Sequence, residues 1–161
     1  MEWQRRMITI SDILSPNQID LDPQFANQEE LVHYVASLLK PNPNVKDWQA
    51  FYDGLKATGS SIFDENGIRL CIPHIRTNSI KMMVMGVGRS EIEPESAAPN
   101  KTPTVQYTFV IGVPNAMASD YLRIIGALAR IFKDKATEAQ LRATKRPEEF
   151  LAILTHKEMV L

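Results

Sequence analysis

The sequence has little of what several classes of protein require. Its only cysteine is Cys71, which excludes an internal disulfide framework and any zinc site built on cysteines. Its apolar runs, such as Ile124 to Ala129, are all far shorter than the roughly 20 residues of a membrane-spanning helix. No apolar signal core follows Arg5 and Arg6. These absences predict a cytoplasmic protein without membrane insertion.

Charge of one sign is not in excess either. The 161 residues contain 18 Lys and Arg against 19 Asp and Glu, a net charge of −1, so nothing predicts binding to nucleic acid. No glycine-rich phosphate loop of the GxxxxGK or GxGxxG type is present, so no nucleotide fold is predicted. The length and the 44% apolar content predict one folded domain over residues 1–161.

Hydrophobic periodicity places helices at both ends of the chain and strands in the middle. A capping box at Asn27 and Glu30 opens a helix that stops before Pro41, and a second helix is expected at about 45–57. Alternating or continuous apolar residues predict three strands, over residues 68–72, 82–88 and 105–113. A loop at 91–103 should separate the last two strands.

The last third of the chain is expected to be helical. A helix capped by Ser119 should bury one apolar stripe, made of Leu122, Ile125, Leu128, Ala129 and Phe132. A second capping box is expected at Thr137 and Gln140, and a short last helix should open at Pro147. The order of elements predicts an α/β fold with a mixed sheet covered by helices on both faces.

The chemistry centres on His74. Pro73 cannot donate to a strand ladder, so it should end the strand at 68–72 and place His74 at the strand's end, where loops usually carry function. A neutral imidazole is a good nucleophile near pH 7. Side chains suited to phosphate oxygens stand close in sequence: Ser60, Ser61, Arg76 and Thr77. The pattern fits a phosphoryl acceptor, although the residues alone favour a structural histidine beside a turn.

The other histidines and the cysteine are expected to be incidental. His33 and His156 are interpreted as solvated side chains that form no metal set with His74. Cys71 is interpreted as a small packed residue whose pKa the nearby His74 could lower. Arg123 and Arg130 are interpreted as part of a solvated helix face.

Several segments together resemble a known family over residues 7–155. They are Ile8 to Pro16, Gly59-Ser60-Ser61, Ile72 to Thr77, Gly88-Arg89-Ser90, Ser119 to Arg130 and Arg146 to Glu149. In this order they are similar to the enzyme IIA domains of the phosphotransferase system (PTS), of the nitrogen-regulatory and fructose/mannitol type.

The resemblance implies a single α/β domain of the PTS EIIA type 2. His74 would take a phosphoryl group from a phosphocarrier protein, and Ser60, Ser61 and Arg76 would bind its oxygens with help from Tyr121. The group would pass to a IIB domain, or the protein would regulate a target according to its phosphorylation. No cofactor, metal or nucleotide is implied, and "enzyme" describes such an intermediate only loosely.

Three departures from the family pattern bear on this role. The glycine-rich turn after Gly59 is replaced by a bulkier one whose Asp64 and Glu65 would repel phosphate if they lay near His74. Leu55 replaces a polar residue, and Tyr121 stands where transport-type members carry a second histidine. A stand-alone nitrogen-regulatory protein is therefore the favoured hypothesis. The alternatives are a sugar-transport IIA protein and an adaptor that no longer accepts phosphate.

Overall fold

The computed structural model describes residues 7–56, 61–65, 67–92 and 104–161, and two long antiparallel strands form its centre. Strand β5 (Val84–Ile92) pairs with β6 (Thr104–Val113) from Val84 opposite Gly112 to Ile92 opposite Thr104. All residues of β6 after Thr104 are buried, as expected for a central strand covered on both faces.

Shorter strands complete a mixed sheet on either side of this pair. Strand β1 (Ile19–Asp20) joins β5 in parallel, and β3 (Ile68–Cys71) joins β6 in parallel. Strand β2 (Ser61–Glu65) lies antiparallel to β3 at the edge. Strand β4 (His74–Arg76) continues the line of β3 and also pairs in parallel with β6. The predicted mixed sheet is confirmed.

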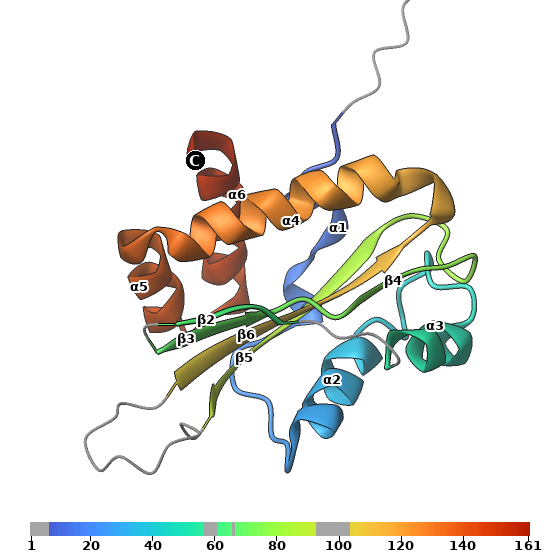
Figure 1. The fold of residues 1–161 in the computed structure, drawn as a ribbon, viewed down its shortest axis with the longest axis horizontal. Helices are drawn as coiled ribbons and strands as arrows, with labels where there is room; N and C mark the ends of the chain where they lie inside the picture. Colours follow the sequence, from blue (N-terminus) through green and yellow to red (C-terminus); the bar gives the residue numbers. More distant parts are fainter. Residues whose placement is uncertain (1–6, 57–60, 66, 93–103) are drawn as a thin grey trace, which may run out of the picture.

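Helices cover both faces of the sheet, as predicted (Figure 1). One face carries α1 (Ile10–Ile13), α4 (Ala118–Lys133), α5 (Lys135–Ala143) and α6 (Pro147–Val160). The other carries α2 (Gln28–Ser37) and α3 (Trp48–Leu55). Short 3-10 turns, η1 (Pro16–Gln18) and η2 (Asn115–Met117), precede β1 and α4. No helix in the described ranges combines the length and the apolar character needed to cross a bilayer.

Helix α2 packs closely on the sheet because the strand beneath it has glycines. A Cβ on Gly88 would lie 2.8 Å from Cγ2 of Val35, too close for a real contact. The predicted capping of α2 is confirmed at Asn27, whose Oδ1 accepts from the N–H of Glu30 at 2.9 Å. The Glu30 carboxylate reaches the N–H of Ala26 rather than that of Asn27.

Several predicted boundaries in the first two thirds of the chain were wrong. The second helix is Trp48–Leu55 rather than 45–57, and Ala57 lies outside the described residues. The central strand predicted at 82–88 is β5, which starts later and continues through Ile92 into the expected loop. Residues 93–103 of that loop lie outside the described residues. Strands β1, β2 and β4 were not predicted at all.

The C-terminal helices also differ from the predictions. Helix α4 starts one residue before Ser119, because the η2 turn leads directly into it. The cap of α5 is Asp134, whose carboxylate accepts from the N–H of Thr137 at 3.1 Å. Helix α6 runs for 14 residues and is not short. Leu122 does not belong to the buried stripe of α4, since it is 66% exposed. The buried residues of α4 are Ile124, Ala127, Leu128, Ile131 and Phe132.

Candidate functional site

His74 is the first residue after a short gap between two strands that pair with the same neighbour. Strand β3 ends at Cys71, Pro73 interrupts the ladder, and β4 begins at His74 itself. The prediction that the strand stops at Pro73, just before His74, is confirmed, but a second strand that starts at His74 was not predicted. The carbonyl of Pro73 accepts from the N–H of Ile111 at 2.9 Å, which keeps the interrupted chain against β6.

The backbone fixes which ring nitrogen of His74 is free. Nδ1 lies 2.6 Å from the carbonyl oxygen of Ile72. Because a carbonyl only accepts hydrogen bonds, Nδ1 must carry the proton, and Nε2 then holds the lone pair of the neutral ring. Ile72 is fully buried, so its carbonyl is a well-anchored partner. Nε2 is thus the nucleophilic atom in this arrangement.

Tyr121 brings a second aromatic ring to His74. It lies in the first turn of α4, and its ring centroid is 4.7 Å from that of His74. Burial raises the pKa of Tyr121 to about 12, so the phenol keeps its proton at neutral pH. A protonated phenol beside the imidazole can donate a hydrogen bond to an oxygen held there. The structure therefore brings these two predicted site residues together.

Arg76 follows His74 on the same strand. Residues two apart in a strand point to the same face, so His74 and Arg76 share a face of β4, whereas Ile75 packs on the other face in the α2 and α3 layer. The Arg76 side chain is exposed. Within the described ranges, no hydrogen bond or salt bridge occupies its guanidinium. It is available to an anion at His74.

The serines of the predicted site are only partly described. Ser60 lies outside the described residues. Ser61 begins β2 and lies opposite Cys71, three residues before His74. The backbone at Ser61 is therefore close in register to the start of β4, and its role in binding oxygens remains a prediction.

Of the two carboxylates expected to oppose phosphate, Asp64 is neutralised, and the side chain of Glu65 lies outside the described part of the structure. Asp64 lies opposite Arg69 in the β2–β3 hairpin, and its Oδ2 is 2.9 Å from Nε and 2.7 Å from Nη2 of Arg69. This pair stands further along the hairpin than Ser61, away from His74. Leu55 is buried in the α3 layer and adds no polar group to the site. The altered turn therefore does not place the charge of Asp64 on the imidazole.

Two asparagines that no sequence pattern indicated connect the two sides of the site. The Asn115 amide donates to Oδ1 of Asn78, joining the segment after β4 to the η2 turn before α4. The N–H of Thr77 donates to the carbonyl of Val113 at 2.8 Å in the same region. These bonds keep the first turn of α4, which carries Tyr121, beside β4. Only the fold brings Asn78 and Asn115 together.

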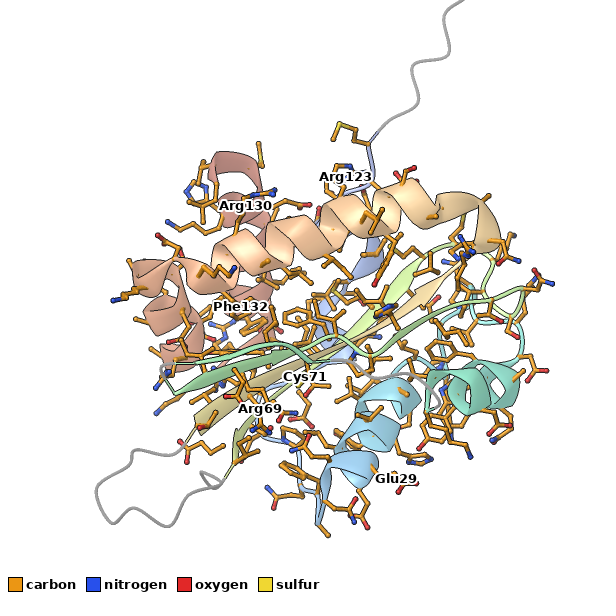
Figure 2. The ribbon with its side chains drawn as sticks, in the orientation of Figure 1. Glu29, Arg69, Cys71, Arg123, Arg130 and Phe132 are labelled. Carbon is orange, nitrogen blue, oxygen red and sulfur yellow. The ribbon has the colours of Figure 1, made fainter. Side chains whose placement is uncertain are left out.

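Cys71 does not take part in this chemistry. It is buried, as predicted, in β3 (Figure 2). Burial raises the pKa of its thiol to about 11, and the positive charge of Arg69 offsets this only in part. The expectation that His74 would lower this pKa was wrong. A thiol that stays protonated at neutral pH is a poor nucleophile and metal ligand.

The remaining candidates lie away from the site. His33 is exposed on α2, as predicted, with ring-edge contacts to Trp48 and Tyr52, and His156 is exposed on α6.

Arg130 and Arg123 lie on the side of α4 away from the sheet (Figure 2). The interpretation of Arg123 as merely solvated was wrong, because Nη1 donates to the carbonyl of Ile8 at 2.5 Å. In the described part of the chain, no three His, Cys, Asp or Glu side chains could hold a metal ion together.

Comparison with known proteins identifies the family of this chain. Residues 12–157 match the model of the family described as phosphoenolpyruvate-dependent sugar phosphotransferase system, EIIA 2. The chain is also similar to the PTS system fructose-specific EIIA component of Haloferax volcanii, with 26% identity over 140 residues that cover 84% of this chain and 90% of that protein.

Solved structures share the fold. The nitrogen regulatory protein IIA-Ntr from Neisseria meningitidis superposes with a TM-score of 0.71 at 24% identity, over 91% of this chain and 99% of that one. Enzyme IIAMTL from Escherichia coli, solved in complex with phosphorylated enzyme IIBMTL, gives a TM-score of 0.62 at 17% identity, over 89% and 97% of the two chains. The family match spans nearly the whole chain, so the resemblance seen in the sequence is confirmed and the chain belongs to the EIIA 2 family of the phosphoenolpyruvate-dependent sugar phosphotransferase system.

Proposed function

We propose that this protein carries a phosphoryl group on Nε2 of His74 and acts in the cytoplasm as a stand-alone, nitrogen-regulatory-type EIIA. The observation that carries the proposal is the bond between Nδ1 and the Ile72 carbonyl, which leaves Nε2 as the free nucleophile beside Tyr121 and Arg76. A phosphocarrier protein with its own phosphohistidine is the proposed donor.

The transfer balances without a metal or nucleotide. The lone pair of Nε2 forms a bond to the donor's phosphorus, while the donor's N–P bond breaks and its ring nitrogen keeps the electron pair. The ring of His74 gains positive charge, which the Ile72 carbonyl stabilises through the proton on Nδ1. Arg76 offsets the charge on the oxygens, and the phenol of Tyr121 donates to one of them. The same steps in reverse pass the group on.

A regulatory role is favoured over sugar transport by the tyrosine at position 121. Transport-type members of the enzyme IIA family that the sequence resembles carry a second histidine at the position of Tyr121. The ring of Tyr121 lies against His74, and its pKa of about 12 prevents it from exchanging protons as an imidazole would. Sugar transport is the second candidate, supported by the fructose-specific relative and by the complex of enzyme IIAMTL with enzyme IIBMTL. A IIB domain would then be the acceptor.

The deciding experiment is phosphorylation of the purified full chain. With phosphoenolpyruvate, enzyme I and a phosphocarrier protein, we expect the mass of one phosphoryl group to be added, stable to base and labile to acid. NMR of the imidazole nitrogens should place the N–P bond at Nε2. An established IIA protein in the same mixture serves as the positive control. If the control is phosphorylated and this chain is not, the protein is instead an adaptor that keeps the fold.

Replacing Tyr121 with phenylalanine tests the role of the phenol. A hydrogen bond to a charged oxygen contributes about 1.5–3 kcal/mol, so the rate of phosphoryl uptake should fall by about tenfold or more. Because the pKa of Tyr121 is about 12, the ratio of wild-type to variant rates should stay constant between pH 6 and pH 9.

The matched control is Tyr34→Phe, which removes a phenol bonded to Asp20 on another part of the molecule. That variant should keep the wild-type rate of uptake. Equal rates for wild type and Tyr121→Phe would show that the phenol does not contact the transferred group.

A further inference from the structure

The first turn of α4 brings Tyr121 to His74, yet core packing does little to hold this turn in place. The fully buried side chains of α4 begin at Ile124, and the residues from Ala118 to Arg123 are half-buried or exposed. The N-cap residue, Met117, has no side-chain oxygen and makes no cap. Helix ends without caps and packing fray, so other bonds must keep the Tyr121 ring beside the imidazole.

Arg123 supplies such bonds, because it joins the first turn of α4 to the N-terminal part of the chain (Figure 2). Its Nη1 donates to the carbonyl of Ile8 at 2.5 Å, and its Nη2 donates to Oδ1 of Asp120 at 3.0 Å. The side chains of Arg123 and Asp120 are only 29% and 19% exposed, so water competes little for these charge-assisted bonds. Asp120 directly precedes Tyr121, and the guanidinium therefore fixes the turn that carries the phenol.

The Ile8 carbonyl is a firm support because the residues that follow it are anchored at several points. The N–H of Thr9 donates to Oδ2 of Asp12 at 2.8 Å at the start of α1. The N–H of Ile10 donates to Oε1 of Glu158, on α6, at 2.9 Å, and the Ile10 side chain is fully buried. The backbone at Ile8 is thus held by both α1 and α6, and Arg123 passes this constraint to α4.

The position of Arg123 on α4 prevents it from contacting a phosphoryl group on His74 directly. At about 100° per residue, a side chain two positions after Tyr121 points about 200° around the helix axis. Figure 2 shows Arg123 on the side of α4 away from the sheet, whereas the Tyr121 ring packs against that of His74 in β4. Any effect of Arg123 on phosphoryl transfer therefore acts through the placement of Tyr121.

We propose that Arg123 is a positioning residue of the phosphoryl site, whose bonds to Ile8 and Asp120 hold the first turn of α4 so that the Tyr121 phenol meets the phosphoryl oxygens. Hydrogen bonds weaken steeply away from their optimal geometry, and a displacement of about 1 Å can remove most of a catalytic contact. The effect on rate rests on the proposed function of His74. The placement of the Tyr121 ring does not, and it is measurable without phosphorylation.

The first test is NMR of the His74 imidazole protons in the full, unphosphorylated chain. Because the two rings lie 4.7 Å apart, the ring current of Tyr121 shifts these signals, and Tyr121→Leu gives their positions without it. We expect Arg123→Ala to move the His74 signals a large part of the way toward those of Tyr121→Leu. Arg130→Ala is the matched control, since this exposed arginine lies seven residues further along the same face of α4. It should leave the signals at their wild-type positions.

The second test is the rate of phosphoryl uptake from the phosphocarrier protein. Arg123→Ala should lower kcat severalfold, up to the roughly tenfold loss expected for Tyr121→Phe, with KM for the carrier unchanged. When combined with Tyr121→Phe, the Arg123 substitution should cause no further loss, because no phenol is left to position. Arg130→Ala should keep the wild-type kcat and KM.

The proposal is overturned if Arg123→Ala leaves the His74 signals at their wild-type positions, or if its loss of rate adds in full to that of Tyr121→Phe. A higher KM with unchanged kcat would place Arg123 in the docking surface for the carrier and would also overturn it. If the wild type accepts no phosphate, the proposed function fails, while the NMR test still decides whether Arg123 positions the ring. Arg123→Lys, which keeps the charge and loses the planar fork, replaces Arg123→Ala if that variant does not fold.

Discussion

His74→Ala is expected to abolish the acid-labile phosphorylation of this protein completely. The variant removes Nε2, the only ring nitrogen that the Ile72 carbonyl leaves with a free lone pair. Tyr121 cannot replace it, because its pKa of about 12 keeps the phenol protonated. Loss of the nucleophile removes the covalent step itself, so uptake should fall below detection in an intact-mass measurement.

The other two histidines provide matched controls for this variant. His33→Ala and His156→Ala each remove an exposed imidazole, from α2 and α6 respectively, and both should be phosphorylated as the wild type is. The fold of His74→Ala should persist, because among the described residues the half-buried His74 ring forms a hydrogen bond only to the carbonyl of Ile72, two residues before it, besides its ring contact with Tyr121. Acid-labile phosphate on His74→Ala equal to that on the wild type would mean that another residue is the acceptor.

Local chemistry explains why the sequence identified His74. A proline lacks the N–H that a central strand ladder needs, so Pro73 predicts a break there from local chemistry alone. The continuation of the chain as β4 could not be predicted, because three residues with two polar side chains have no readable period. Their strand geometry comes from pairing with residues of β6 that lie 37 positions further along the sequence, as His74 with Ile111.

The electrostatics of the site depend on strand register, which the sequence does not specify. Asp64 and Glu65 stand between the Gly-Ser-Ser turn and His74 in the sequence, so both seemed able to approach a phosphate. The hairpin puts Asp64 opposite Arg69, and the cross-strand pair neutralises the carboxylate. The contact between His74 and Tyr121 likewise arises from how α4 docks on the sheet.

The orientation of α4 shows that a helix can be predicted correctly from its hydrophobic period while the residues assigned to its buried face are wrong. The expected stripe contained Leu122 and Phe132, which both fit a period of 3.6 residues. In the structure Phe132 lies between α4 and the sheet (Figure 2), whereas Leu122 is 66% exposed in the first turn. The buried face includes Ile124 and Ile131, so it is rotated from the expected stripe.

Phe132→Ala should therefore be among the most destabilising single changes in the chain. The ring is 1% exposed, and its centroid lies 4.5 Å from that of Tyr107 and 5.5 Å from that of Phe109. Truncating a buried phenylalanine removes its burial free energy and leaves a cavity, which together cost about 3–5 kcal/mol. Urea denaturation followed by circular dichroism should show the midpoint shifted to much lower urea.

Leu122→Ala is the control that separates the observed docking of α4 from the expected stripe. Truncation of an exposed leucine should change the free energy of unfolding by no more than about 0.5 kcal/mol. If α4 were docked on the expected stripe, the two variants would lose comparable stability. A large loss in Leu122→Ala would contradict the helix orientation that also places Tyr121 against His74, so this measurement on stability tests the geometry of the phosphoryl site as well.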